Sequence, residues 1–169
     1  MARKRSHDLS CSVARALDDV GDWWSLLVVK EAMLGTRRFV DFQQSLGIAR
    51  NILCNRLERL VDNGVLNKHD VGEHGVRYEY RLTDKGRDLF TVITALRQWS
   101  DRWNGCNLPL QMLDRASERP IRSVTVQDAD GRSLTVRDVF YCADDAEDES
   151  VSDGEGSGMR RASQKRVRQ

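Results

Sequence analysis

Residues 47–64 read GIARNILCNRLERLVDNG, and the helix that they predict organises the rest of the chain around it. A three-residue turn, Gly47-Ile48-Ala49, leads into a predicted helix from Arg50 to Asn63, which Gly64 ends. At about 100° per residue, one face of this helix is apolar and is expected to pack on the body of the protein. That face consists of Leu53, Leu57, Leu60 and Val61.

The opposite face of this helix is polar. It carries Asn51 and Asn55 with Arg59 beside them, while Arg50 opens the helix and Arg56 flanks it. In the major groove of DNA an Asn amide can pair with adenine, and Arg can pair with guanine or hold a phosphate. These five residues are therefore candidate DNA-binding residues.

Two carboxylates, Glu58 and Asp62, occupy the later half of the same face. Because carboxylates repel phosphate, we expect the N-terminal half of the helix to enter the groove. A polar face is equally typical of an ordinary helix facing solvent, so the helix alone does not establish DNA binding.

Three helices are predicted before this one. They span Leu9–Val20, Trp23 to about Leu34, and Phe39–Leu46. Gly21 separates the first two, and Asp22 is expected to cap the second.

After Gly64 the periodicity changes from that of a helix to that of strands. Two short strands are predicted at residues 65–68 and 77–82, with a loop at 70–75 between them, and Thr83 caps a last long helix. Helix, short turn, helix and hairpin is the order of a winged helix-turn-helix, so the fold class is mainly α with a small β part. Basic side chains in two places are candidate phosphate contacts, although each could be an ordinary surface charge. Arg37 and Arg38 precede the third helix, and Lys68, His74 and Arg77 lie on or near the hairpin, or wing.

The last helix carries an apolar seam whose members step by 3, 4, 3 and 4: Leu89, Val92, Leu96, Trp99 and Trp103. This a/d pattern could pack on its own domain, or on the same helix of a second chain together with Leu9, Val13 and Leu17. Dimerisation would suit a DNA-binding protein, because it places two DNA-reading helices about 34 Å apart, the spacing of the half-sites in a palindrome.

Composition excludes several classes. The 169 residues are 40% hydrophobic and 31% charged with a formal net charge of +1, and the aliphatic run at residues 26–29 is far too short to span a membrane. No signal peptide is apparent, so a cytoplasmic protein without membrane contact is expected. The cysteines, at positions 11, 54, 106 and 142, form no C-x-x-C motif, and no catalytic or nucleotide motif occurs. We expect no metal, no cofactor and no enzymatic activity.

The remaining chain predicts two further parts beyond a winged domain at residues 8–105. Residues 120–127 and 132–137 alternate around an Asp-Gly turn, which predicts a small β-hairpin within an extension at 106–142. Residues 143–158 hold seven acids and 159–169 hold five bases. Since 143–169 has almost nothing apolar, a disordered tail is expected there.

Five segments, taken together and in this order, resemble the HxlR-type winged helix-turn-helix transcriptional regulators of bacteria: residues 11–17, 21–27, 35–39, 48–57 and 78–86. The resemblance implies a homodimer that binds a pseudo-palindromic operator and acts as a repressor or autoregulator. It places the groove-entering segment at Arg50, Asn51, Asn55 and Arg56, and the wing around residues 72–77. The chain departs from the family pattern at Ser12 (usually Pro), Ala49 (often Ser) and Cys54 (often Ser or Thr).

The resemblance also points to Cys11, because some family members sense oxidants or electrophiles with a Cys at the start of the first helix. The helix dipole there favours a thiolate, whereas a small buried apolar side chain is the simpler interpretation. A small-molecule or oxidant signal thus joins operator DNA and a second copy as an expected partner. Two other functions stay open: a winged helix that binds protein instead of DNA, and an enzyme with a site in the C-terminal extension.

Overall fold

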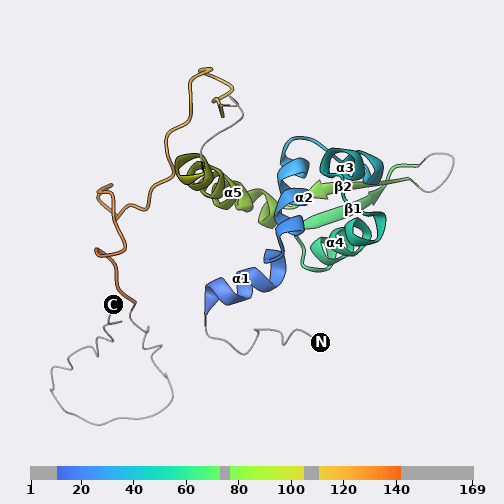
Figure 1. The fold of residues 1–169 in the computed structure, drawn as a ribbon, viewed down its shortest axis with the longest axis horizontal. Coiled ribbons are helices and arrows are strands. Elements are labelled where there is room, and N and C mark those ends of the chain that lie inside the picture. Colours follow the sequence, from blue (N-terminus) through green and yellow to red (C-terminus); the bar gives the residue numbers. More distant parts are fainter. Residues whose placement is uncertain (1–10, 73–76, 105–110, 142–169) are drawn as a thin grey trace, which may run out of the picture. The chain divides into compact units, whose positions relative to one another are not determined.

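The computed structural model describes residues 11–72, 77–104 and 111–141 (Figure 1). It confirms the mainly α winged helix-turn-helix. The elements are, in order, α1 (Ser12–Val20), α2 (Trp23–Met33), α3 (Phe39–Leu46), α4 (Arg50–Asp62), β1 (Leu66–Asp70), β2 (Tyr78–Leu82) and α5 (Asp84–Trp103). The helix bounds agree with the sequence to within about one residue except at α1, whose expected start at Leu9 lies outside the described residues.

Two side-chain caps form as the sequence predicts. The Asp22 carboxylate accepts a hydrogen bond of 3.0 Å from the Ser25 amide at the start of α2, and the Thr83 hydroxyl accepts one of 3.0 Å from the Gly86 amide at the start of α5. Gly47, in the turn between α3 and α4, has φ of 60°, a left-handed conformation that glycine adopts without strain.

The core lies under the inner face of α4. Leu53, Leu57 and Leu60 are fully buried, as their spacing predicts, whereas Val61 at the edge of this face is only partly buried. They pack with buried side chains from α2, α3 and the start of β1: Val28, Val29, Phe42, Val65 and Leu66. This packing fixes one side of α4 and turns the opposite side to solvent.

The wing is a two-stranded antiparallel sheet whose register runs from Leu66 opposite Leu82 to Asp70 opposite Tyr78. The first strand ends two residues later than predicted. A contact that the sequence did not indicate joins the segment before α3 to this sheet, where Arg38 pairs with Glu79 and the Tyr80 amide donates to the Arg37 carbonyl over 2.8 Å. The α2–α3 connection therefore lies along the edge of β2.

The predicted C-terminal hairpin forms next to its turn. The Asp128 amide donates to the Arg132 carbonyl over 3.1 Å, and the Leu134 amide donates to the Val126 carbonyl over 2.8 Å. The regular strands expected at 120–127 and 132–137 are replaced by this short pairing, which includes a bridge between Gln127 and Ser133. Most side chains of this segment are exposed, and a two-stranded hairpin without a packed face is marginal. The hairpin is therefore shorter than the sequence predicts.

The chain divides into two compact units, residues 1–124 and 125–169. Within the first unit, the side-chain amide of Gln98 on α5 forms hydrogen bonds with the backbone of residues 122 and 124. It accepts from the Val124 amide over 2.7 Å and donates to the Arg122 carbonyl over 3.2 Å. In the described part, no helix combines the length and the apolar character that crossing a bilayer requires. The tail predicted at 143–169 lies outside the described residues.

Candidate nucleic-acid interface

The outer face of α4 is exposed over its first two turns. Arg50, Asn51 and Asn55, three of the predicted DNA-binding residues, lie on it together with Cys54 and Glu58. The Arg50 guanidinium lies 5.2 Å from the centre of the Phe39 ring, a cation–π contact that places this charge where α3 meets α4. Ala49 gives α4 no side-chain cap, as expected, so the N-terminal amides of α4 have no partner from that side chain.

Two arginines predicted beside them are engaged within the chain instead. The Arg56 Nε atom lies 2.9 Å from an oxygen of Asp22, the residue that caps α2, and another Arg56 nitrogen donates to the Asn55 side-chain oxygen over 3.2 Å. Both members of the Arg56–Asp22 pair are largely buried. The pair thus ties α4 to the start of α2 and orients Asn55.

Arg59 lies further along α4 and contacts α1. Its guanidinium donates to the Asp18 carbonyl, and the side-chain amide of Asn63 donates to the Asp19 carbonyl over 3.1 Å. These carbonyls belong to the last turn of α1, where cationic donors are favoured by the helix dipole. The structure therefore engages Arg56 and Arg59 in contacts within the chain, and their role in binding DNA stays a prediction.

The wing presents further cations beside α4. Lys68 and Arg77 are exposed, and the Lys68 ammonium lies 3.9 Å from the centre of the Tyr78 ring. Hydrogen bonds from the Gly72 and Arg77 amides lower the pKa of Asp70, so this carboxylate stays ionised and closes the base of the wing loop. His74, the other wing candidate, lies outside the described residues.

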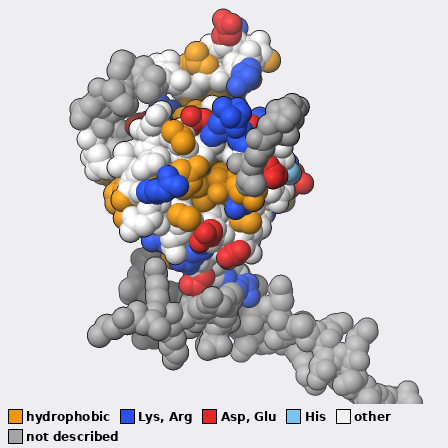
Figure 2. Space-filling view, turned by 90° about the vertical axis from the view of Figure 1, so that its right-hand side faces the viewer, with side chains coloured by type: hydrophobic (Ala, Val, Ile, Leu, Met, Phe, Trp, Pro, Cys, Tyr) orange, Lys and Arg blue, Asp and Glu red, His pale blue; other side chains and the backbone are white. Residues whose placement is uncertain are grey.

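Arg37 and Arg38 are exposed on the α2–α3 connection, next to Glu79 of β2. A hydrogen bond from Arg81 lowers the pKa of Glu79 most, and the charges of Arg37 and Arg38 lower it further. One carboxylate is therefore shared among three guanidinium groups, which leaves this edge of the sheet positively charged. Figure 2 shows the molecule from the right-hand side of Figure 1, where basic side chains lie above an apolar centre and acidic ones below it.

Cys54 and Glu58 form a pair on the outer face of α4 that sequence reasoning did not identify. The Cys54 thiol donates to a Glu58 oxygen over 3.4 Å. This hydrogen bond raises the pKa of Cys54, more than the charges of Arg50 and Lys68 lower it, so the thiol is a neutral donor. Their spacing of four residues was the available signal.

The predicted dimerisation residues mostly face outward. Val13 and Leu17 of α1 are exposed, as are Val92, Leu96, Trp99 and Trp103 of α5. Leu89 instead packs against the core of its own domain, and Leu9 lies outside the described residues. Cys11 is exposed at the N-cap of α1.

Carboxylates of the C-terminal extension serve its turns. The pKa values of Asp114, Asp128 and Asp138 are lowered by hydrogen bonds from nearby backbone amides and polar side chains. Such bonds stabilise the ionised form and close the local turns. They offer no pair of carboxylates with divergent pKa values of the kind that acid–base catalysis uses.

Comparison with known proteins identifies a family to which this chain is similar. The model of the HxlR-like helix-turn-helix family matches residues 19–107. An uncharacterized HTH-type transcriptional regulator of Mycobacterium tuberculosis, Rv3095, is 46% identical over 92 residues, which are 54% of this chain and 58% of that protein. The match thus spans somewhat more than half the length of this relative.

Two solved structures share the architecture. The crystal structure of PA1607, a candidate transcription factor, has 40% sequence identity and a TM-score of 0.78, covering 83% of this chain and all of the other. The structure of PA1374 from Pseudomonas aeruginosa, also a candidate transcription factor, has 38% identity and a TM-score of 0.59, covering 82% and 96%. Both similarities extend beyond residues 19–107, and the relatives are described as regulators rather than as enzymes.

Proposed function

This chain belongs to the HxlR-like helix-turn-helix family of transcriptional regulators, and from that premise we propose that it is a cytoplasmic homodimer that binds a pseudo-palindromic operator in double-stranded DNA. It acts there as a repressor or autoregulator. The observation that supports this most is the exposed polar strip at the start of α4, with Arg50, Asn51 and Asn55, held outward by the buried leucines on the opposite side.

In the proposed complex the first two turns of α4 enter the major groove. The amides of Asn51 and Asn55 pair with base edges, while Arg50 holds a phosphate or a guanine. Arg37 and Arg38, at the edge of β2, and Lys68 and Arg77, on the wing, are exposed and contact phosphates, which fixes the register of the protein on the duplex without reading sequence. His74 is proposed to contact DNA from the wing on the strength of the sequence alone.

The two copies are proposed to meet through α1 and α5. Val13 and Leu17 on one helix, and Val92, Leu96, Trp99 and Trp103 on the other, are large apolar side chains exposed in the single chain. Clusters of this kind mark protein interfaces. Leu9 is included in this proposed interface on the sequence pattern alone. Leu89 packs against the core of its own domain and holds α5 there.

A salt titration tests DNA binding directly. Full-length protein is titrated against the DNA upstream of its own gene and against a scrambled duplex of the same length, at two salt concentrations. Binding should weaken steeply with salt on both, because phosphate contacts release counterions, and should be tighter on the native DNA. Equal affinity for the two duplexes would contradict the proposal.

Two single variants should separate sequence reading from phosphate contact. Asn51→Ala should cost about 1–3 kcal/mol on the preferred DNA and relax the choice of one base pair per half-site. Arg37→Ala should weaken binding to all duplexes alike and make the salt dependence shallower by about one phosphate contact. Fluorescence anisotropy on the native and single-mismatch duplexes measures both effects, and equal responses of the two variants would contradict these roles.

Cys11 is proposed as the entry point of an oxidant signal, because it is exposed at the start of the helix that we place in the dimer interface. A mild oxidant should reduce DNA affinity of the parent protein and of Cys54→Ser, but not of Cys11→Ser. Thiol labelling before and after oxidation identifies the modified residue. Cys54 is also exposed. If only Cys54→Ser lost the response to oxidant, Cys54 on α4 would be the sensor instead of Cys11.

A further inference from the structure

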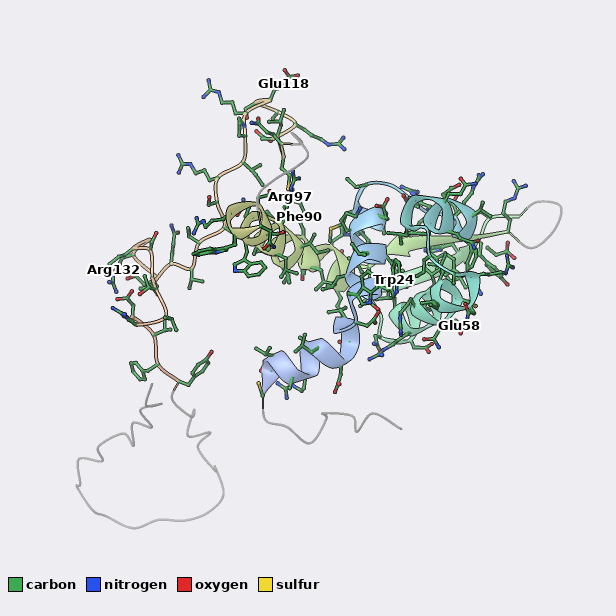
Figure 3. The ribbon with its side chains drawn as sticks, in the orientation of Figure 1. Trp24, Glu58, Phe90, Arg97, Glu118 and Arg132 are labelled. Carbon is green, nitrogen blue, oxygen red and sulfur yellow. The ribbon has the colours of Figure 1, made fainter. Side chains whose placement is uncertain are left out.

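Glu58 continues the line of side chains that we propose to read DNA. Asn51, Asn55 and Glu58 are spaced i, i+4 and i+7, so they fall on one side of α4, and all three are exposed. Figure 3 labels Glu58 on α4. A helix that places Asn51 and Asn55 against base edges brings Glu58 to the groove one turn further along. This inference rests on the proposed function.

A carboxylate in the groove needs a hydrogen-bond donor, because the phosphates around it are repulsive. Two features of the structure reduce that repulsion. The Cys54 thiol donates to one Glu58 oxygen over 3.4 Å, and the positive charges of Arg50 and Lys68 act on that thiol. Within residues 11–72, 77–104 and 111–141, the Cys54 hydrogen bond engages one Glu58 oxygen, and the second oxygen is open to a donor from DNA.

The major groove offers two kinds of amino donor, N4 of cytosine and N6 of adenine. Adenine presents the acceptor N7 next to its amino group, which would face the carboxylate with lone pairs of its own. Cytosine presents its amino group without such an acceptor on the same base. The chemistry of Glu58 therefore matches cytosine better than adenine.

We propose that Glu58 is a specificity-determining residue of this protein, which accepts a hydrogen bond from N4 of a cytosine in each half-site while the Cys54 thiol orients its carboxylate. Asn51 and Asn55 read neighbouring base pairs in the same groove. Each half-site is thus expected to contain a G·C pair at the position that faces Glu58, next to the base pairs that Asn51 and Asn55 read.

Selection from random DNA tests this assignment and requires no known operator sequence. Full-length protein is used to select duplexes from a library with 24 random base pairs, a length of roughly two helical turns that holds two half-sites, and the bound pool is sequenced. The parent should enrich a cytosine at one position per half-site by at least about fivefold over other bases. Glu58→Gln should replace that cytosine by adenine, because Gln pairs with N6 and N7 of adenine, and should leave the other positions unchanged.

Asp62→Asn is the matched control, since Asp62 lies on the same side of α4 one turn further from its N-terminus. It removes the same charge and should raise affinity for all duplexes without changing the enriched bases. Cys54→Ala should weaken the cytosine preference while keeping its position. If Glu58→Gln selects the same bases as the parent, as Asp62→Asn does, the assignment of Glu58 is wrong while the proposed function stands. If the parent itself enriches no sequence, sequence-specific binding and this assignment both fail.

Discussion

The double variant Leu96→Asp/Trp99→Asp is expected to be a folded monomer that binds palindromic DNA about 10²–10⁴ times more weakly than the parent. In a dimer the second half-site is bound by a tethered partner, so its effective concentration is high, and a monomer loses that gain. Affinity for a single half-site should be nearly unchanged, because α4 and the wing are untouched.

The reason lies in the exposed apolar side of α5. Leu96, Trp99 and Trp103 have exposed fractions of 48%, 59% and 71% in the single chain, so charged replacements there disturb little of the domain's own core. In a dimer the same positions would be buried, where an unpaired carboxylate is strongly disfavoured. The two substitutions therefore act on association and spare folding.

Sedimentation equilibrium measures the mass, and anisotropy on full and half palindromes measures the affinities. Gln111→Asp/Ala116→Asp, at two exposed positions of the C-terminal extension, adds the same charge and should remain a dimer with parental affinity. A double variant at 96 and 99 that still sediments as a dimer would show that the copies associate through another surface.

Gly86→Ala should destabilise the fold by about 1–3 kcal/mol, although helix propensity alone predicts a gain of about 1 kcal/mol for the same change. Gly86 lies in the first turn of α5, against the start of β1. A Cβ atom there would lie 2.2 Å from the Val65 carbonyl oxygen and 2.9 Å from a methyl group of Leu82. The carbonyl is main chain and also accepts from the Thr83 amide and hydroxyl, so it cannot move away at low cost.

Urea denaturation at one fixed protein concentration measures this effect, because association of the copies also adds to apparent stability. Thr91→Ala is the control, since Thr91 is exposed in the middle of α5 and its replacement should stabilise the helix by about 0.5 kcal/mol. A Gly86→Ala variant more stable than the parent would mean that α5 and β1 do not approach as closely as the structure places them.

The elements of the winged domain could be predicted because their signals are local. The apolar spacing of α4, the Asp22 and Thr83 caps and the glycine after α3 each act within about two helical turns, and the structure has all of them. The hairpin of the extension shows the limit of local signals. Its Asp-Gly turn forms, but strands need a packed face, and the segment's own pattern could not supply one.

The partners of long charged side chains were not predictable in the same way. The sequence placed Arg59 beside the polar face of α4 and Arg56 at its flank. In the structure Arg56 reaches Asp22, the N-cap of α2, and Arg59 reaches the Asp18 carbonyl of α1. The contact between Arg59 and Asp18 spans 41 positions of sequence. Helical periodicity predicts the side of α4 on which a side chain lies, but it does not predict which other helix or strand that side chain contacts.

The order of elements, their caps and the polar side of α4 were thus encoded in the sequence, since each depends on neighbours a few residues away. Which of the polar residues remain available to a ligand followed from packing. Bringing α1 and α2 against one flank of α4 engaged Arg56 and Arg59, while the wing brought Lys68 to the other flank beside Cys54 and Glu58. Such contacts depend on where distant segments meet in space, and that placement is a property of the whole fold rather than of any stretch of it.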